Sequence, residues 1–179
     1  MKLIAFGASN SSKSINKALS TYAASLCEGA DIEILDLNDF EAPLFSVDLE
    51  NEIGKSEPAQ RFLDKIGEAD GLIISFAEHN GLYTAAYKNL FDWCTRIQRE
   101  VYQNKPVLVL GTSPGGRGAK TVLELATSSL PRFGANIVAK LSVPNFNDNF
   151  DYENLQLTNQ NVKNELELCL LYTSDAADD

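Results

Sequence analysis

The stretch that decides the fold spans residues 2–16 and reads KLIAFGASNSSKSIN. Its first residues form a short apolar run that ends at Gly7, which is typical of a buried strand. From Ser14 onward apolar residues recur at helical spacing, and Gly29 is placed to end the helix. The stretch therefore predicts a strand, a serine-rich loop and a helix.

The same alternation of strand and helix continues along the chain. The further strands are short and almost wholly apolar, which favours a parallel sheet covered by helices on both faces. Right-handed crossovers then make a doubly wound α/β sandwich the natural architecture, and no internal repeat or domain boundary is visible. The expected strands are 31–37, 71–76, 106–111 and 137–143; helices are expected from near Pro58 to Ile66, over 84–97 and 119–130, and from Thr158 onward, with a long proline- and acid-containing connection over 38–57.

The end of the chain breaks this pattern. Residues 169–179 read CLLYTSDAADD, and one codon reading of the string matches a transposon-end adapter used in DNA sequencing libraries. We therefore expect a single domain over residues 1–168, followed by a non-native tail over 169–179. Resequencing the locus across this point tests the expectation.

Length and charge exclude several classes of protein. With 179 residues the chain suffices for one ordinary domain and is too short for two. A formal net charge of −10, from 15 basic and 25 acidic residues, repels nucleic acid and anionic membranes. No apolar run approaches the roughly 18 residues of a membrane span, and the apolar start is too short for a signal peptide, so a cytoplasmic protein is expected.

The cysteines and the single histidine argue against a metal site. Cys27, Cys94 and Cys169 are widely spaced without a CxxC pair, and only His79 could supply an imidazole. A zinc site of Cys and His ligands cannot be assembled from this set, and no metal is expected. Buried thiols are the simpler interpretation of the cysteines.

The loop after the first strand suits an anion. Ligands of doubly wound sheets bind at the carboxyl ends of the strands, and residues 7–16 offer serine hydroxyls, asparagine amides and the N-terminus of a helix there. A capping serine and a solvated loop explain the same residues equally well. The segment lacks the GxxxxGK[ST], GxGxxG and GxSxG patterns, which disfavours a P-loop, a dinucleotide fingerprint and a hydrolase elbow.

Two more loops should lie at the same edge. Residues 75–83 read SFAEHNGLY and place His79 where a ligand would lie, although a lone histidine is more often structural or merely exposed. Residues 112–119 read TSPGGRGA, and their glycines would let a flat ligand approach the backbone, or simply make the loop flexible. Three such loops at one edge favour a binding site.

In these three loops the chain resembles the NADPH-dependent FMN reductase family. Gly7-Ala8-Ser9 with Ser14-Ile15-Asn16 resembles the family's phosphate loop. Glu78-His79-Asn80-Gly81 followed by Lys88-Asn89-Leu90-Phe91-Asp92-Trp93 resembles its PEYNG and KNAIDW segments. Ser113-Pro114-Gly115-Gly116-Arg117-Gly118 resembles its SxGGxG loop, and the match runs from about residue 2 to 143.

The resemblance implies a flavodoxin-like fold with strand order 2-1-3-4-5 and FMN at the carboxyl edge. NADPH or NADH would reduce the flavin, which would pass two electrons to free flavin, a quinone or a similar small-molecule acceptor. No side-chain catalyst is implied, and His79 would at most contact the ring or the acceptor. The residues carried over are Ser9, Ser11, Ser14, Ile15 and Asn16 for the FMN phosphate, Ala77, Glu78, His79, Asn80 and Gly81 along the ring, and Ser113, Pro114, Gly115 and Gly116 on its other side.

The family also forms homodimers or homotetramers with flavin sites near the subunit contact. Tyr83, Tyr87 and Phe91 are candidates for that contact, although core packing explains aromatic residues at helical spacing as well.

Three positions depart from the family pattern. Its phosphate-loop arginine falls at Ser11, its tyrosine at His79 and its proline at Ala77, and Lys13 could supply the missing positive charge. Two other functions fit the same sequence: a flavodoxin-type electron carrier, and a non-enzymatic protein of the same fold that has lost FMN. No residue pattern decides between NADH and NADPH.

Overall fold

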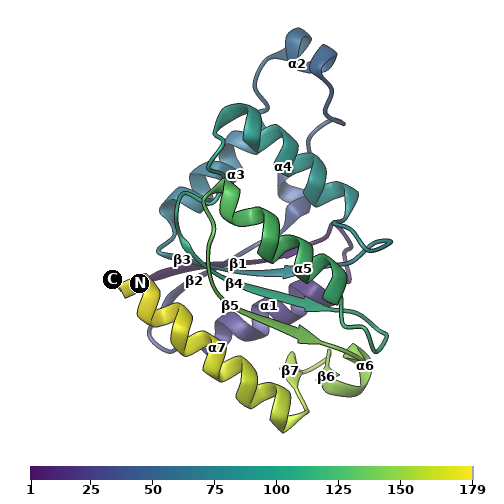
Figure 1. Cartoon of the computed structure of the whole chain (residues 1–179), viewed down its shortest axis with the longest axis vertical. Coiled ribbons are helices and arrows are strands. Elements are labelled where there is room, and N and C mark those ends of the chain that lie inside the picture. Colours follow the sequence, from purple (N-terminus) through teal and green to yellow (C-terminus); the bar gives the residue numbers. More distant parts are fainter. Residues whose placement is uncertain (179) are drawn as a thin grey trace.

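The protein is built on a five-stranded parallel sheet, and its computed structural model describes residues 1–178 (Figure 1). The strand order is β2-β1-β3-β4-β5, which confirms the expected doubly wound topology. The strands are β1 (Lys2–Ala8), β2 (Asp31–Leu35), β3 (Gly71–Phe76), β4 (Pro106–Thr112) and β5 (Asn136–Val143), with a small antiparallel pair of β6 (Phe150–Asp151) and β7 (Gln156–Leu157) beside it.

Helices cover both faces of the sheet (Figure 1). Along β1, Ile4 and Phe6 pack into one apolar core and Leu3 and Ala5 into the other, because side chains alternate between faces. One face is covered by α1 (Ile15–Ser25) and α7 (Gln160–Asp178), and the other by α3 (Glu57–Glu68), α4 (Ala85–Ile97) and α5 (Lys120–Ser129), the last followed by a 3-10 helix, η2 (Leu130–Phe133).

Side-chain caps explain where three of these helices begin. The hydroxyls of Ser14, Ser56 and Thr84 accept backbone N–H groups in the first turns of α1, α3 and α4. Each capping residue has an extended backbone, as expected just before a helix. These starts agree with the helices that the apolar spacing predicts.

The long connection after β2 contains two short helices that the sequence pattern does not predict. Asp36 ends β2 early by capping the 3-10 helix η1 (Leu37–Phe40). Ser46 caps α2 (Val47–Ile53), and no residue of α2 is buried. Leu49 is the α2 residue that packs against the apolar core, and it is only partly buried, so α2 lacks the repeated buried apolar spacing that predicts a helix.

Two residues of α4 form hydrogen bonds to residues 42–45 of the connection between β2 and α3. The side-chain amide of Asn89 donates to the carbonyls of Ala42 and Pro43, and its oxygen accepts the Phe45 N–H. The indole N–H of Trp93 donates to the Pro43 carbonyl at 2.7 Å. The asparagine and tryptophan of the KNLFDW segment therefore have structural partners.

The C-terminal part of the chain is helical. A short helix, α6 (Phe146–Asn149), follows β5, and α7 then runs unbroken across Leu168, the expected end of the native domain. Leu166 and Leu170 of α7 are buried against the sheet. The expectation of a non-native tail stays a prediction that DNA sequencing has to test. Within residues 1–178, the helices are too short or too polar to cross a bilayer.

Candidate functional site

Three loops meet at the carboxyl edge of the sheet. The register pairs Ala8 with Phe76, and Phe76 with Gly111, so that β1, β3 and β4 end side by side. The loops that follow them enclose a polar cavity of about 180 Å³. Its lining consists of Ser9, Ser11, Lys13, Ser14, Ile15, Asn16, Ala77, Glu78, His79, Thr112, Ser113 and Pro114.

Most of the residues nominated from the sequence belong to this lining. The exceptions are Asn80, Gly81, Gly115 and Gly116, which lie on the same loops but do not line the cavity. Thr112 and Lys13 also line the cavity, and Lys13 is the residue that could supply the positive charge of the family's arginine. The sequence thus locates the three loops, and the structure brings them to one place.

The loop after β1 presents hydrogen-bond donors to the cavity. Within it, the Ser9 hydroxyl accepts the Ser11 N–H at 3.2 Å, and the Ser14 hydroxyl accepts the Lys17 N–H at 3.1 Å. In the described part of the chain, the N–H groups of Ile15 and Asn16 at the start of α1 have no acceptor. They lie at the positive end of the helix dipole, the kind of position that binds phosphate groups.

The side chain of Asn16 has a different role from the one expected. It is buried, and its amide donates to the Thr112 carbonyl at 3.1 Å. Its oxygen accepts the Thr112 N–H at 3.0 Å and the Ser75 hydroxyl at 2.8 Å. Asn16 therefore joins the start of α1 to β3 and β4, which leaves only its backbone N–H for a ligand.

The loop after β3 is a tight hairpin. His79 and Leu82 exchange both backbone hydrogen bonds, at 3.0 and 3.1 Å. Between them Asn80 and Gly81 have φ values of 54° and 79°, as in a type I′ turn, for which Asn-Gly is the preferred pair. The Asn80-Gly81 pair is the sequence signal that predicts such a turn. The hairpin leaves His79 exposed at the rim of the cavity.

The carboxylate of Glu78 contacts α5. One of its oxygens accepts the backbone N–H of Val122 at 3.0 Å. The loop after β3 is thereby linked to the helix that follows the glycine-rich loop. No sequence pattern indicates this contact.

The glycines of the loop after β4 have different reasons to be glycine. Gly118 has a φ of 57°, and a Cβ there would come within 2.5 Å of the Ser142 hydroxyl and 2.8 Å of the Pro144 nitrogen. A Cβ on Gly115 would meet nothing within 4 Å. Close packing against the end of β5 therefore requires Gly118, whereas nothing within this chain requires Gly115.

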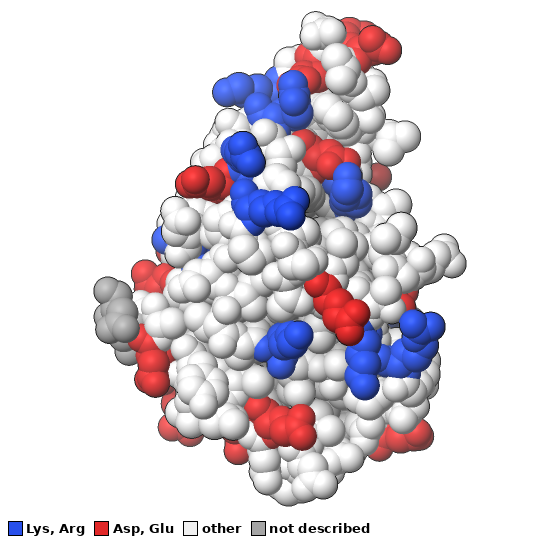
Figure 2. Space-filling view, viewed as in Figure 1, with Lys and Arg blue, Asp and Glu red and all other residues white. Residues whose placement is uncertain are grey.

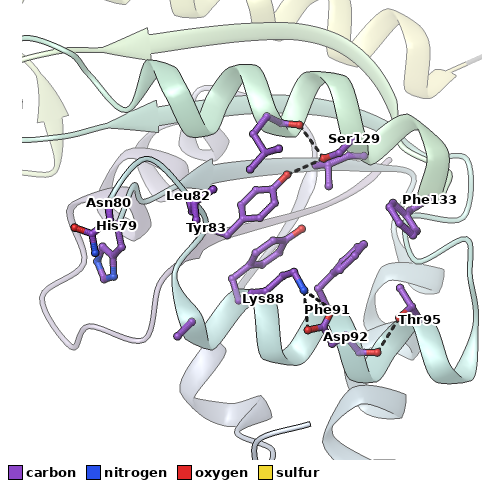
Figure 3. A pocket seen from close by; sticks show the side chains of 14 residues that line it. His79, Asn80, Leu82, Tyr83, Lys88, Phe91, Asp92, Thr95, Ser129 and Phe133 are labelled. Carbon is purple, nitrogen blue, oxygen red and sulfur yellow. Dashed lines mark hydrogen bonds and ion pairs between the residues drawn. The ribbon is translucent and has the colours of Figure 1, made fainter. Parts of the chain in front are cut away.

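A second, apolar cavity adjoins the polar one. It measures about 750 Å³, lies between α4 and α5, and shares His79 with the polar cavity. Figure 3 shows the rings of Tyr83, Phe91 and Phe133 directed into it. Leu82 at its edge is 60% exposed. Figure 2 shows charged side chains scattered around a broad uncharged area in the middle of the face in view.

Two tyrosines of the apolar cavity differ in exposure. Tyr83 is half-buried and bonds through its hydroxyl to the Ser129 hydroxyl at 3.0 Å, and burial raises its pKa. Tyr87 is buried in the core and hydrogen-bonds to the hydroxyl of Tyr102, and burial raises the pKa of both groups. Tyr87 is thus a core residue, while Tyr83 and Phe91 are partly accessible.

Comparisons with known proteins agree with one another. A family model described as NADPH-dependent FMN reductase matches residues 1–148. NADH-dependent flavin reductase subunit 2 from Lactobacillus johnsonii is 28% identical over 176 residues, which cover 94% of this chain and 92% of that one. An NAD(P)H-dependent FMN reductase from Pseudomonas aeruginosa is 30% identical over 119 residues, covering 66% and 63% of the two chains.

Solved structures show the same fold. FerB from Paracoccus denitrificans, described as a flavoenzyme NAD(P)H:(acceptor) oxidoreductase, superposes with a TM-score of 0.76 at 23% identity. The match covers 99% of this chain and 97% of FerB. The azoreductase AzrA superposes with a TM-score of 0.61 at 18% identity, covering 97% of this chain and all of the other. The likeness establishes the flavodoxin-like sandwich.

Proposed function

The chain belongs to the NADPH-dependent FMN reductase family, and from this premise we propose that it binds FMN at the carboxyl edge of its sheet and reduces a small acceptor with NADPH or NADH. Membership in the family makes the chain an oxidoreductase that uses a flavin and a nicotinamide nucleotide. The proposal adds the cofactor's identity, its position and the class of acceptor. The acceptor we propose is free flavin or a quinone.

The observation that carries the proposal is the donor set of the polar cavity. A phosphate monoester needs several hydrogen-bond donors and a positive potential. Hydroxyls of Ser9 and Ser11, the backbone N–H groups of Ile15 and Asn16, and the Lys13 ammonium all line this one cavity. The residues fit the FMN phosphate, and the neutral donors suit a protein of net charge −10.

The loops after β3 and β4 would hold the flavin ring. In the proposal, backbone groups of 77–81 and 113–116 face the ring edges, and buried Ala77 keeps water from its apolar side. When bound, FMN supplies a two-electron carrier that accepts a hydride from the nicotinamide nucleotide and reduces the acceptor. The chain orients these partners and provides N–H donors near developing negative charge. In the proposal, His79, which is exposed at the rim, donates to an acceptor oxygen.

We also propose that a second copy of the chain covers the apolar cavity between α4 and α5. Its lining is predominantly aliphatic and aromatic, and Leu82 projects beside it with 60% of its surface exposed. An apolar surface of this kind is typical of the core of a subunit interface. Because both cavities share His79, the contact would lie next to the flavin site.

The first test is a visible spectrum of the purified protein after incubation with FMN, followed by anaerobic addition of NADPH or NADH. Flavin bands that bleach rapidly, with turnover when free flavin or a quinone is added, support the proposal and identify the preferred donor. Flavin bands that bleach only slowly favour a flavodoxin-type electron carrier. A protein that retains no FMN has kept the fold and lost the cofactor.

A proline substitution tests the phosphate site separately. Ile15 is the first residue of α1, where proline is compatible with a helix, and the extended Ser14 before it suits a following proline. Ile15→Pro removes one proposed phosphate donor and should weaken FMN binding much more than riboflavin binding. Val47→Pro makes the same change at the first residue of α2 and should leave both affinities unchanged. Equal losses for FMN and riboflavin in Ile15→Pro would count against the phosphate site.

A further inference from the structure

Helix α5 begins without a cap from its own chain segment. The residue before it, Ala119, has a left-handed backbone with φ 57° and makes no capping hydrogen bond through its side chain. The preceding residues 115–118 include three glycines and offer no capping side chain in the usual position. In its first turn the N–H of Val122 is instead bound by the Glu78 carboxylate at 3.0 Å.

This bond is stronger than an ordinary cap. A carboxylate that accepts a backbone N–H forms a charge-assisted hydrogen bond, and its negative charge faces the positive end of the helix. Val122 is fully buried, so its N–H depends on the carboxylate for a hydrogen-bond partner in the folded protein. Glu78 is therefore the group that fixes the first turn of α5.

The same bond connects two loops of the flavin site. Glu78 stands between Ala77 and His79, which line the polar cavity, whereas Val122 belongs to the helix that anchors the glycine-rich loop. The loop after β3 also approaches α5 at Gly81, where a Cβ would lie 3.7 Å from the Thr121 methyl group. The length of the Glu78 side chain thus fixes the separation of the loops on the two sides of the cavity.

We propose that Glu78 is a positioning residue of the flavin site: its carboxylate caps α5 from the loop after β3 and holds the two loops at the spacing that FMN binding needs. The role rests on the proposed function, because it presupposes that the ring lies between these loops. The side chain acts through backbone position and takes no part in electron transfer.

The experiment compares Glu78→Ala and Glu78→Gln with the wild type in two measurements. The first is amide hydrogen exchange of Val122 in the protein without flavin, followed by NMR. The second is the FMN dissociation constant, measured by quenching of flavin fluorescence well below the melting temperature of every variant. Ser56→Ala is the matched control, since it removes the side-chain cap of α3, a bond of 3.4 Å, outside the lining of the polar cavity.

We expect Glu78→Ala to speed Val122 exchange and to raise the FMN dissociation constant, each by about tenfold or more. Glu78→Gln keeps an acceptor oxygen at the same length and should restore both values to near those of the wild type. Ser56→Ala should lower the melting temperature and leave FMN affinity within about twofold.

Three results would overturn the assignment. One is an FMN affinity in Glu78→Ala that changes no more than in Ser56→Ala. Another is a Glu78→Gln protein whose Val122 amide is protected but whose FMN affinity is still lost, because the charge would then matter in place of the position. The third is a wild type that does not bind FMN, which refutes the proposed function as well, while the exchange measurement still reports on the cap itself.

Discussion

The carboxamide of Asn16 bonds to both backbone groups of Thr112, donating to the carbonyl at 3.1 Å and accepting the N–H at 3.0 Å. The register between β3 and β4 ends at Phe76 and Gly111, and Asn16 thereby supplies hydrogen bonds to Thr112 one position beyond that pair. The same carboxamide oxygen accepts the Ser75 hydroxyl at the end of β3. One side chain at the start of α1 thus fixes the ends of two strands that carry site loops.

Asn16→Ala should lower the free energy of unfolding by about 2–4 kcal/mol, because it leaves buried polar groups of Thr112 and Ser75 without partners. Urea denaturation monitored by circular dichroism measures the change. Ser20→Ala is the control, since Ser20 is equally buried on α1 but its hydroxyl bonds only within the helix, to the Lys17 carbonyl. Equal stability of the two variants would contradict the role given to Asn16.

Gly7→Ala should destabilise the protein by about 3 kcal/mol through overpacking. A Cβ at this position would lie 2.4 Å from the Lys17 nitrogen and 2.7 Å from its Cα, which are backbone atoms of α1 that cannot move aside. Gly115→Ala adds the same methyl group where nothing lies within 4 Å and should change stability by less than about 0.5 kcal/mol. Thermal unfolding of both variants checks the contrast, and a stable Gly7→Ala protein would disagree with the close approach of β1 and α1.

Because the Cys94 thiol is buried, we expect the free energy of unfolding of the protein to fall at alkaline pH. Burial raises its pKa from 9.0 to about 12, so the folded protein keeps the proton that the unfolded chain releases. Its contribution is therefore fully present below pH 9 and is lost as the pH rises from 9 toward 12, with a slope of at most about 1.4 kcal/mol per pH unit. Cys94→Ala should show a shallower decline than the wild type when urea unfolding is repeated at pH 8, 9 and 10.

The reactivity of Cys94 toward thiol reagents is a second test of its burial. We expect the native protein to leave Cys94 unmodified by a disulfide reagent at pH 8, and the unfolded protein to expose it. Mass spectrometry after labelling identifies the modified residue. Rapid labelling of Cys94 in the native state would mean that this part of the core opens readily.

Leu82→Glu should convert the proposed dimer into a monomer, because it places a charge at the edge of the apolar cavity that a second copy is proposed to cover. Leu168→Glu on α7 is the control; Leu168 is 53% exposed, similar to the 60% of Leu82, but lies on the other face of the protein. Sedimentation velocity at several concentrations measures the association. A wild type that is monomeric at all of them would refute the proposed interface.

The sequence pattern predicts those parts of the fold that bury apolar residues locally. Strands β3 and β4 are continuous apolar runs buried on both faces, and β3 matches its expected bounds, residues 71–76. Helix α2 is not predicted because none of its residues is fully buried and only Leu49 packs partly against the core. The sheet order came from the family resemblance, since periodicity alone does not specify which strands are neighbours.

The sequence also predicts the candidate site only in part. Its loops were predicted because they carry serine, glycine and asparagine after apolar strands. The side-chain roles of Asn16 and Glu78 were not, because their partners lie 96 and 44 residues away along the chain. Hydrogen bonds over such distances depend on how the loops fold back on one another, and no local pattern records them.

The close approach of β1 and α1 at Gly7 affects what the glycine of the phosphate-loop motif indicates about function. A glycine is required there by the contact between β1 and α1, which exists whether or not any phosphate is bound. In a related protein without flavin chemistry, a residue larger than glycine at this position would still clash with α1 and be disfavoured. Gly7 is therefore a marker of the architecture, whereas Lys13 and Ser11 are exposed and are not needed to pack the fold, so loss of the cofactor would first become visible at these two positions.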